Sequence, residues 1–162
     1  MTKNQPPTTD RPRAEIARYA LLPLRLIVGY GFLAHGVTKW SKGPAAFAGI
    51  LHSAGIPAPH WMAWITILVE LFTGIAILAG AFVLLVSLPA IGLLAVAIVS
   101  VHLPYGFSSI KLMGIVNGRA QFGPPGYECD LLYISAFLAL ALSGPTPWSV
   151  DAYRRRASRA AG

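Results

Sequence analysis

Charged residues are scarce in this sequence, and acidic residues are the scarcest. Charged residues make up 12% of the chain, with six Asp and Glu against 13 Lys and Arg. The single cysteine, Cys129, excludes an internal disulfide and a Cys-x-x-Cys pair, so any thiol chemistry needs a partner molecule. No glycine-rich phosphate loop, nucleophilic triad or metal-binding motif is visible. The common signatures of soluble nucleotide-binding, hydrolytic and metal-dependent enzymes are therefore missing.

The chain is instead rich in long apolar segments. Hydrophobic residues make up 55% of it, and the mean hydropathy is +0.59. A helix that crosses a bilayer needs roughly 20 mainly apolar residues, and four segments meet or approach that length: about 21–40, 61–78, 82–103 and 127–144. Residues 61–103 as one helix would be about 64 Å long, so two antiparallel spans that turn near Gly80 fit better. We predict an all-α membrane protein built as a four-transmembrane-helix bundle.

The basic residues predict how the chain is oriented. Most of the 13 Lys and Arg residues lie in the two terminal tails, and few lie in the segments that would face the other side. Under the positive-inside rule both termini are cytoplasmic, and the tails attract anionic lipid. Because the net charge of +7 is concentrated in these tails, nucleic acid is not an expected partner.

The sequence divides into three regions. Residues 1–9 are polar and contain prolines, so we expect a disordered tail. Residues 10–152 form a single membrane domain, and residues 153–162 form a basic cytoplasmic tail. On the outer side, "PAAFAGILHSAGIPAP" predicts a short interfacial helix after the first span. Residues 104–126 are expected to form a long outer loop, and loops of that length are usually functional or partner-binding.

One face of the first predicted span combines small and charged residues. Arg25, Gly29, Phe32, Gly36 and Lys39 follow one another at spacings of four, three, four and three, so they share a helical face. We expect this face to be buried against other helices. The two glycines would allow a close approach, as small residues do in membrane bundles.

Glu70 is the only charged residue in the apolar stretch "WITILVELFTGIAILAG", and it shares a face with Thr66, Thr73 and Gly74. A charge at the bilayer centre costs about 3 kcal/mol on insertion scales. Glu70 should therefore be paired, protonated or in contact with water. Its candidate cationic partners lie in the first span: Lys39, His35 and Arg25.

Several other polar residues fall in the outer half of the predicted bundle, above the depth of Glu70. Their convergence predicts a polar pocket that opens outward. These residues are His35, Lys39, His102, Glu128 and Asp130.

Purely structural interpretations compete with this one. Glu70 and a first-span cation could form a buried ion pair that only fixes helix packing. Arg25 and Lys39 lie near span ends, where long basic side chains extend to the membrane interface.

The two histidines have alternatives of their own. His35 and His102 could be axial haem ligands, or with Glu128 could form a metal site. A pair of histidines is a weak signal, and a hydrogen-bonded core histidine is commoner, so we predict no metal. Cys129 is expected to be a packed thiol rather than a nucleophile.

The sequence resembles the DoxX family of small bacterial four-helix membrane proteins. The resemblance runs from about Leu21 to Ala152. It rests on the first-span face described above, "FAGILHSAGIP", Glu70 with Gly74 and Gly80, the "GYE" that contains Glu128, and the closing "SGPTPWSVDA" with Ser149 and Asp151.

The resemblance implies a multi-pass protein of the bacterial cytoplasmic (inner) membrane with a quinone or redox connection. We expect a subunit or partner of a quinone-linked respiratory or oxidative-defence system, an oxidoreductase component without autonomous activity. Its pocket in the outer half of the bundle would take quinone or another small ligand. A non-catalytic scaffold or a small-solute carrier is the alternative. No cofactor can be demonstrated from the residues; quinone is the candidate. The candidate partners are membrane lipid, redox-enzyme subunits and further copies of the chain.

The predicted site has two parts. The groups expected to handle protons or the polar group of the ligand are Glu70, Lys39 and His35. The residues expected to contact the ligand are Arg25, Gly29, Phe32, Gly36, Thr66, Thr73, His102 and Glu128.

Overall fold

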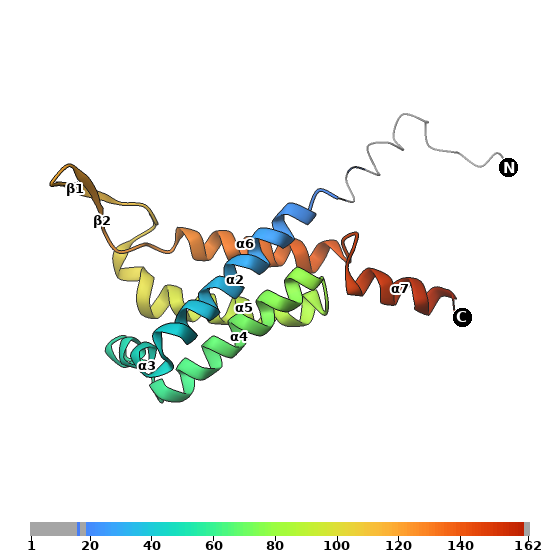
Figure 1. Cartoon of the computed structure of the whole chain (residues 1–162), viewed down its shortest axis with the longest axis horizontal. Helices are drawn as coiled ribbons and strands as arrows, with labels where there is room; N and C mark the ends of the chain where they lie inside the picture. Colours follow the sequence, from blue (N-terminus) through green and yellow to red (C-terminus); the bar gives the residue numbers. More distant parts are fainter. Residues whose placement is uncertain (1–15, 17–18, 161–162) are drawn as a thin grey trace.

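The computed structural model describes residue 16 and residues 19–160, which form a mainly helical bundle (Figure 1). Its long helices are α2 (Leu22–Lys42), α4 (Pro59–Ala79), α5 (Val83–Ala97) and α6 (Glu128–Ser143). The shorter elements are α3 (Pro44–Ser53), the π-helical turn η1 (Ile98–His102), the 3-10 turn η2 (Leu103–Tyr105), strands β1 (Leu112–Val116) and β2 (Arg119–Phe122), and α7 (Val150–Ala160). The predicted disordered tail, residues 1–9, lies outside the described residues.

The bundle has two distinct ends (Figure 1). The start of α2, the turn between α4 and α5, and helix α7 lie together at what we call the α7 end. Helix α3 and the strands β1 and β2 lie at the opposite end, the hairpin end. As the sequence predicts, α4 and α5 are antiparallel and turn at Gly80, whose φ of 63° lies in the left-handed region that glycine adopts without strain.

Helices α2 and α4 make the most extensive contact in the bundle, and glycines allow it. A Cβ atom added to Gly74 would lie 2.5 Å from the backbone nitrogen of Leu33, and one added to Gly29 would lie 2.9 Å from the backbone nitrogen of Leu78. These distances are shorter than van der Waals contact. The small-residue face of the first span therefore packs as its spacing predicts.

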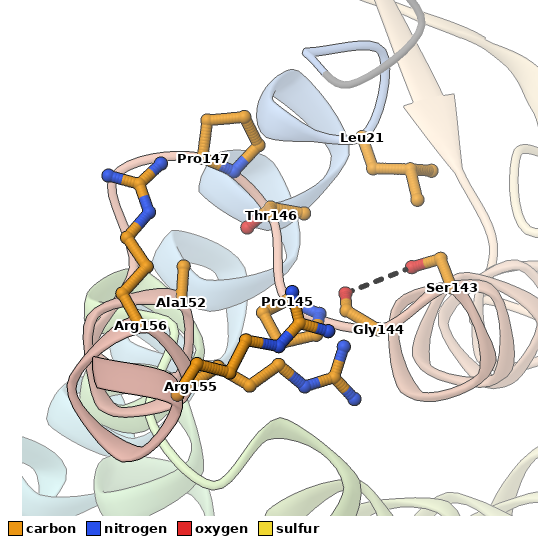
Figure 2. Close-up of a pocket in the computed structure, with 10 residues that line it drawn as sticks. Leu21, Ser143, Gly144, Pro145, Thr146, Pro147, Ala152, Arg155 and Arg156 are labelled. Atoms are coloured by element: carbon orange, nitrogen blue, oxygen red, sulfur yellow. Dashed lines mark hydrogen bonds between the residues drawn. The ribbon is translucent and has the colours of Figure 1, made fainter. Parts of the chain in front are cut away.

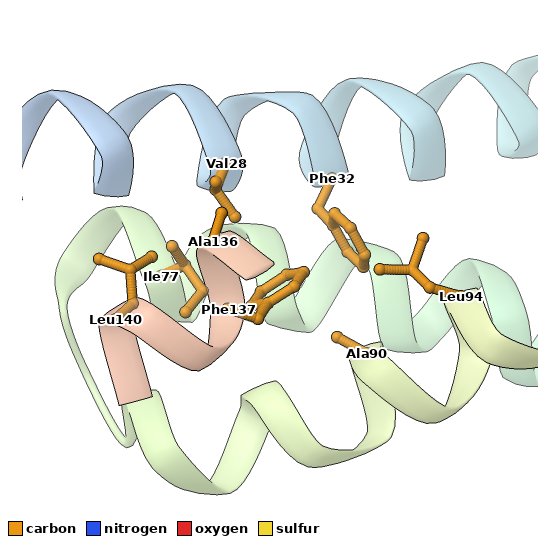
Figure 3. Packing of buried hydrophobic residues seen from close by; sticks show 8 residues of the cluster. All are labelled: Val28, Phe32, Ile77, Ala90, Leu94, Ala136, Phe137 and Leu140. Carbon is orange, nitrogen blue, oxygen red and sulfur yellow. The ribbon is translucent and has the colours of Figure 1, made fainter. Parts of the chain in front are cut away.

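The hydrophobic core draws on all the long helices (Figure 3). Phe32 of α2 packs edge-on against Phe137 of α6, with ring centroids 4.8 Å apart. The buried members of this core are Val28, Phe32, Ile77, Ala90, Leu94, Ala136, Phe137 and Leu140. Phe32 is thus a core residue that links α2 to α6.

Two helices are long and apolar enough to cross a membrane. They are α4 and the continuous helix from Val83 to Tyr105, which contains α5, η1 and η2. Among the described helices α2 and α6 do not meet this criterion, because α2 contains Arg25, Lys39 and Lys42, and α6 has only 16 residues. Both nevertheless expose large apolar side chains on their outer faces, such as Ile27 and Leu142.

Exposed aromatic pairs occupy both ends of the bundle. Trp40 and Trp64 stack edge-on at the hairpin end with centroids 5.7 Å apart, and Tyr19 and Trp148 lie 5.4 Å apart at the α7 end. All four side chains are exposed. Tryptophan and tyrosine are enriched at membrane–water interfaces, so pairs at both ends of the bundle are typical of a membrane protein.

Segment 104–126, expected as a long loop, contains a β-hairpin. Strands β1 and β2 pair antiparallel, and the dipeptide Asn117-Gly118 turns between them with φ values of 51° and 73°. Positive φ at both central residues is the requirement of the tightest hairpin turns, and Asn-Gly is their strongest sequence signal. The described bundle is mainly helical, as predicted, and also carries this β-hairpin.

The segment expected as a basic tail forms helix α7, which is anchored to the bundle. Asp151 accepts hydrogen bonds from the backbone N–H groups of Phe82 and Val83, at 3.0 and 3.2 Å. These donors belong to the first turn of α5 and have no partner within that helix. The carboxylate of α7 thereby caps α5 and fixes the start of α7 against the α4–α5 turn.

Candidate functional site

Lys39 of α2 and Glu70 of α4 form an ion pair across the most extensive helix contact of the bundle. The side chain of Glu70 is 7% exposed, and that of Lys39 is 24% exposed. Lys39 Nζ also lies 4.8 Å from the centre of the Phe47 ring of α3, a cation–π contact. Of the cations considered for Glu70, the structure therefore selects Lys39.

One oxygen of Glu70 is left without a partner. Oε1 accepts the hydrogen bond from Lys39, whereas the buried Oε2 has no hydrogen-bond partner among the described residues. An unpaired buried acceptor costs about 1–3 kcal/mol, so native proteins keep few of them. This carboxylate therefore retains an unused capacity to bind a proton or a donor.

A second acid–base pair lies at the same end of the bundle. His102 Nδ1 of the π-helical turn is 2.7 Å from Asp130 Oδ2 of α6. The contact lacks hydrogen-bond geometry, so it is electrostatic. His35 is exposed and precedes Lys39 by one turn of α2. Asp130 is one of the polar residues predicted to converge in the outer half of the bundle, but it is not among the predicted ligand contacts.

An apolar cavity of about 390 Å³ lies between α3, α4 and α5. Its walls are mostly aliphatic. Lys39, Thr66 and His102 supply its titratable and hydroxyl-bearing groups, together with Ser100. The aliphatic walls include Ile50, Leu51, Ile56, Ile65, Val69, Leu93, Val96 and Val101. Lys39 therefore lines the cavity and also contacts Glu70, which is not one of the lining residues.

The π-helical turn shapes one side of the cavity. Helix α5 continues through Pro89, and the chain changes to π-helical geometry only at Ile98–His102. Such turns insert one extra residue into a helix and occur frequently at functional sites. Here the turn carries His102 and Ser100 at the cavity wall.

Several predicted ligand contacts lie elsewhere. Arg25 is buried at the α7 end, where its guanidinium donates to Thr146 Oγ1 and to the carbonyl oxygens of Pro147 (3.1 Å) and Trp148 (3.2 Å). Arg25 therefore holds α2 to the chain segment before α7. It does not reach the cavity at the hairpin end.

Most of the remaining predicted ligand contacts instead join parts of the fold to one another. Glu128 Oε2 accepts a hydrogen bond from the backbone N–H of Ser109 at 3.0 Å and so ties segment 104–126 to α6. Thr73 is buried and donates to the Val86 carbonyl at 3.5 Å. Gly29 and Gly36 lie in the α2–α4 contact. Within the predicted set, Lys39 pairs with Glu70, and Lys39, Thr66 and His102 line the same cavity.

The described residues contain no group of three or more His, Cys, Asp or Glu side chains that could hold a metal ion. His35 and Glu128 thus do not join His102 in such a cluster. Cys129 is a free thiol on the surface, which corrects its expected place in the packed interior.

The family model of DoxX matches residues 20–103, just over half of the chain. The chain belongs to the DoxX family. The uncharacterized membrane protein Rv3486 of Mycobacterium tuberculosis (strain ATCC 25618 / H37Rv) is 28% identical to this DoxX protein over 146 residues, which cover 87% of this chain and 83% of the relative. No solved structure matches this chain.

The DoxX match contains the entire cavity. Every residue that lines it, from Lys39 to His102, lies within residues 20–103, and so does Glu70. The "GYE" and "SGPTPWSVDA" segments lie beyond the match. The chain is a membrane protein, in agreement with its two apolar helices of spanning length.

Proposed function

We propose that this DoxX protein is the quinone-binding membrane subunit or partner of a redox system, and that the cavity beside Lys39 and Glu70 holds the quinone head group. The observation that carries the proposal is the composition of this cavity. It has about 390 Å³ of space, aliphatic walls and a few polar groups at its edge. Ligand pockets for small apolar molecules have this size and composition.

Quinone chemistry fits the polar groups of the cavity. A quinone is an apolar ring with two carbonyl oxygens, each of which needs a hydrogen-bond donor. Lys39 and Thr66 supply such donors at the cavity wall. The exposed apolar side chains of α5, such as Val96, give an isoprenoid tail a path into the lipid.

The two acid–base pairs suit the proton balance of the reaction. Reduction of a quinone to a quinol takes up two electrons and two protons. His102 lines the cavity, and the carboxylates of Asp130 and Glu70 contact the lining residues His102 and Lys39. All three can bind protons. The electrons would come from a redox-active partner subunit, so this chain acts as a component without autonomous activity.

The membrane arrangement proposed here has four spans with both termini in the cytoplasm of a bacterial cell, as a multi-pass protein of the inner membrane. Support comes from the apolar outer faces of α2 and α6, which continue the exposed apolar surface of α4 and α5. The start of α2 and helix α7 also lie at the same end of the bundle (Figure 1). The cavity then faces the outer half of the membrane.

Filling the cavity tests the proposal. Gly92 lines the cavity, and a Cβ atom added there meets nothing within 4 Å. Gly92→Leu should therefore occupy the ligand space without disturbing the fold, and we expect the affinity for a short-chain ubiquinone to fall about tenfold or more. Titration of the purified protein with this quinone, followed by tryptophan fluorescence, measures the change.

Gly49→Leu is the matched control for this titration. Gly49 is an open helical glycine of α3 that does not line the cavity. We expect the control to bind the quinone as tightly as the wild type does. Unchanged quinone affinity in Gly92→Leu would contradict it.

A scaffold or small-solute carrier is the second candidate, and the buried ion pair favours it. Lys39 and Glu70 join α2 and α4 where glycines already bring the two helices into close contact. If their role is only structural, Glu70→Gln lowers the thermal stability and leaves the rate of quinone reduction in native membranes unchanged. A lower rate in a stably folded Glu70→Gln variant favours the redox function.

A further inference from the structure

Two hollows flank helix α7 where it meets the membrane helices. The first, of about 390 Å³, lies between α7 and the chain segment 143–147, and Arg155, Arg156 and Arg159 line it (Figure 2). The second, of about 550 Å³, has apolar walls from α5 and α6, and Arg154 and Arg155 line its edge. Arg155 borders both hollows.

Positive charge dominates this region. Asp151 is the only acidic residue of α7, and both of its oxygens already accept hydrogen bonds from the first turn of α5. In the described part of the chain, no carboxylate forms an ion pair with the arginines of α7. Their charge is therefore available to an anionic ligand.

The arginines are presented on a fixed support. The capping of α5 by Asp151 holds the first turn of α7, and the N–H of Ala152 donates to Ser149 Oγ at 3.1 Å. Arg25 binds the carbonyl oxygens of Pro147 and Trp148 just before the helix. The guanidinium of Arg154 lies 4.7 Å above the Phe82 ring. Ordering of this kind lowers the entropic cost of binding.

The hollows lie beside the ends of two helices of spanning length. Helix α4 ends and α5 begins at this end of the bundle, and both belong to helices of spanning length. Leu84 beside the second hollow is 61% exposed, and Leu142 on α6 is 81% exposed. A ligand here meets arginine at one end and a lipid-facing apolar surface at the other.

We propose that the α7 end is a binding site for an anionic phospholipid, with the phosphate on the arginines of the two hollows and an acyl chain along α5 and α6. The guanidinium group matches phosphate oxygens in geometry and charge. A zwitterionic lipid would bring its own cation into the arginine cluster and bind more weakly. The site is independent of the cavity at the hairpin end.

The test compares two variants with equal loss of charge. Arg155→Gln/Arg159→Gln removes two cations from the hollows, and Lys111→Gln/Arg119→Gln removes two from the hairpin end. Native mass spectrometry of the full chain in detergent, titrated with dioleoyl phosphatidylglycerol, measures lipid retention. We expect the α7 variant to lose about tenfold or more in affinity, because each basic residue near anionic lipid contributes about 1 kcal/mol. The hairpin variant should bind as the wild type does.

Three outcomes would overturn the proposal. Equal weakening in both variants would indicate general electrostatic attraction instead of a site. Equal retention of dioleoyl phosphatidylcholine by the wild type would remove the requirement for an anionic lipid. Displacement of phosphatidylglycerol by millimolar inorganic phosphate would assign the arginines to a soluble anion. Since the substituted arginines are exposed, the variants should melt within a few degrees of the wild type, which a thermal scan checks.

Discussion

Replacing Gly74 with alanine is expected to destabilise the protein by about 3 kcal/mol, at the upper end of the range for overpacked sites. The added Cβ would lie 2.5 Å from the backbone nitrogen of Leu33 and 2.8 Å from its Cα. Backbone atoms cannot turn aside as a flexible side chain can, so α2 and α4 would have to separate. Thermal unfolding of the purified protein in detergent measures the loss.

Gly92→Ala is the control for this prediction. Gly92 is also a glycine within a membrane helix, but a Cβ atom there has no neighbour within 4 Å. Alanine is favoured over glycine in a helix by about 1 kcal/mol, so Gly92→Ala should keep or raise the melting temperature. If Gly74→Ala and Gly92→Ala change the melting temperature alike, Gly74 is not required for the close packing of α2 on α4.

Lys39→Met should destabilise the protein more than Glu70→Gln, because the two partners differ in burial. Removing Lys39 leaves a carboxylate that is 7% exposed with no cation beside it, and breaking a buried pair from one side costs about 3 kcal/mol. Removing the charge of Glu70 leaves Lys39, which is 24% exposed and has a long stem that can reach the interface. We expect a loss of about 1 kcal/mol for Glu70→Gln, typical of a partly solvated pair.

The double variant Lys39→Met/Glu70→Gln tests the physical reason. It removes both charges, so most of the stability lost in Lys39→Met should return. Equilibrium unfolding of the wild type, both single variants and the double variant gives the coupling energy. A double variant as unstable as the sum of the two single variants would show that Lys39 does not act by neutralising Glu70.

The sequence predicted the features that follow from periodicity. The spacing of Gly29, Phe32, Gly36 and Lys39 placed them on one face of α2, and this face packs against the rest of the bundle. The isolated charge of Glu70 in an apolar stretch required a partner, and Lys39 was among the candidates. Such local regularities can be recognised without knowing the tertiary structure.

The features that escaped prediction depend on contacts between distant segments. Arg25 shares a helical face with Lys39, but its partners Thr146, Pro147 and Trp148 lie more than 120 residues away in the chain. The cap that Asp151 provides for α5 also joins distant segments, since Asp151 lies 69 residues from Phe82 and 68 from Val83. The hairpin is different, because Asn117-Gly118 was a local signal that we overlooked.

Photolabelling tests the central claim, that the cavity beside Lys39 and Glu70 binds quinone, most directly. A photoreactive quinone analogue is cross-linked to the protein in native membranes, and the labelled peptides are mapped by mass spectrometry. We predict adducts on the cavity walls in α3, α4 and α5. An excess of unlabelled quinone should suppress these adducts, and the Gly92→Leu substitution should remove them. Labelling confined to the β-hairpin or α7, or labelling of the cavity walls that unlabelled quinone does not suppress, would contradict it.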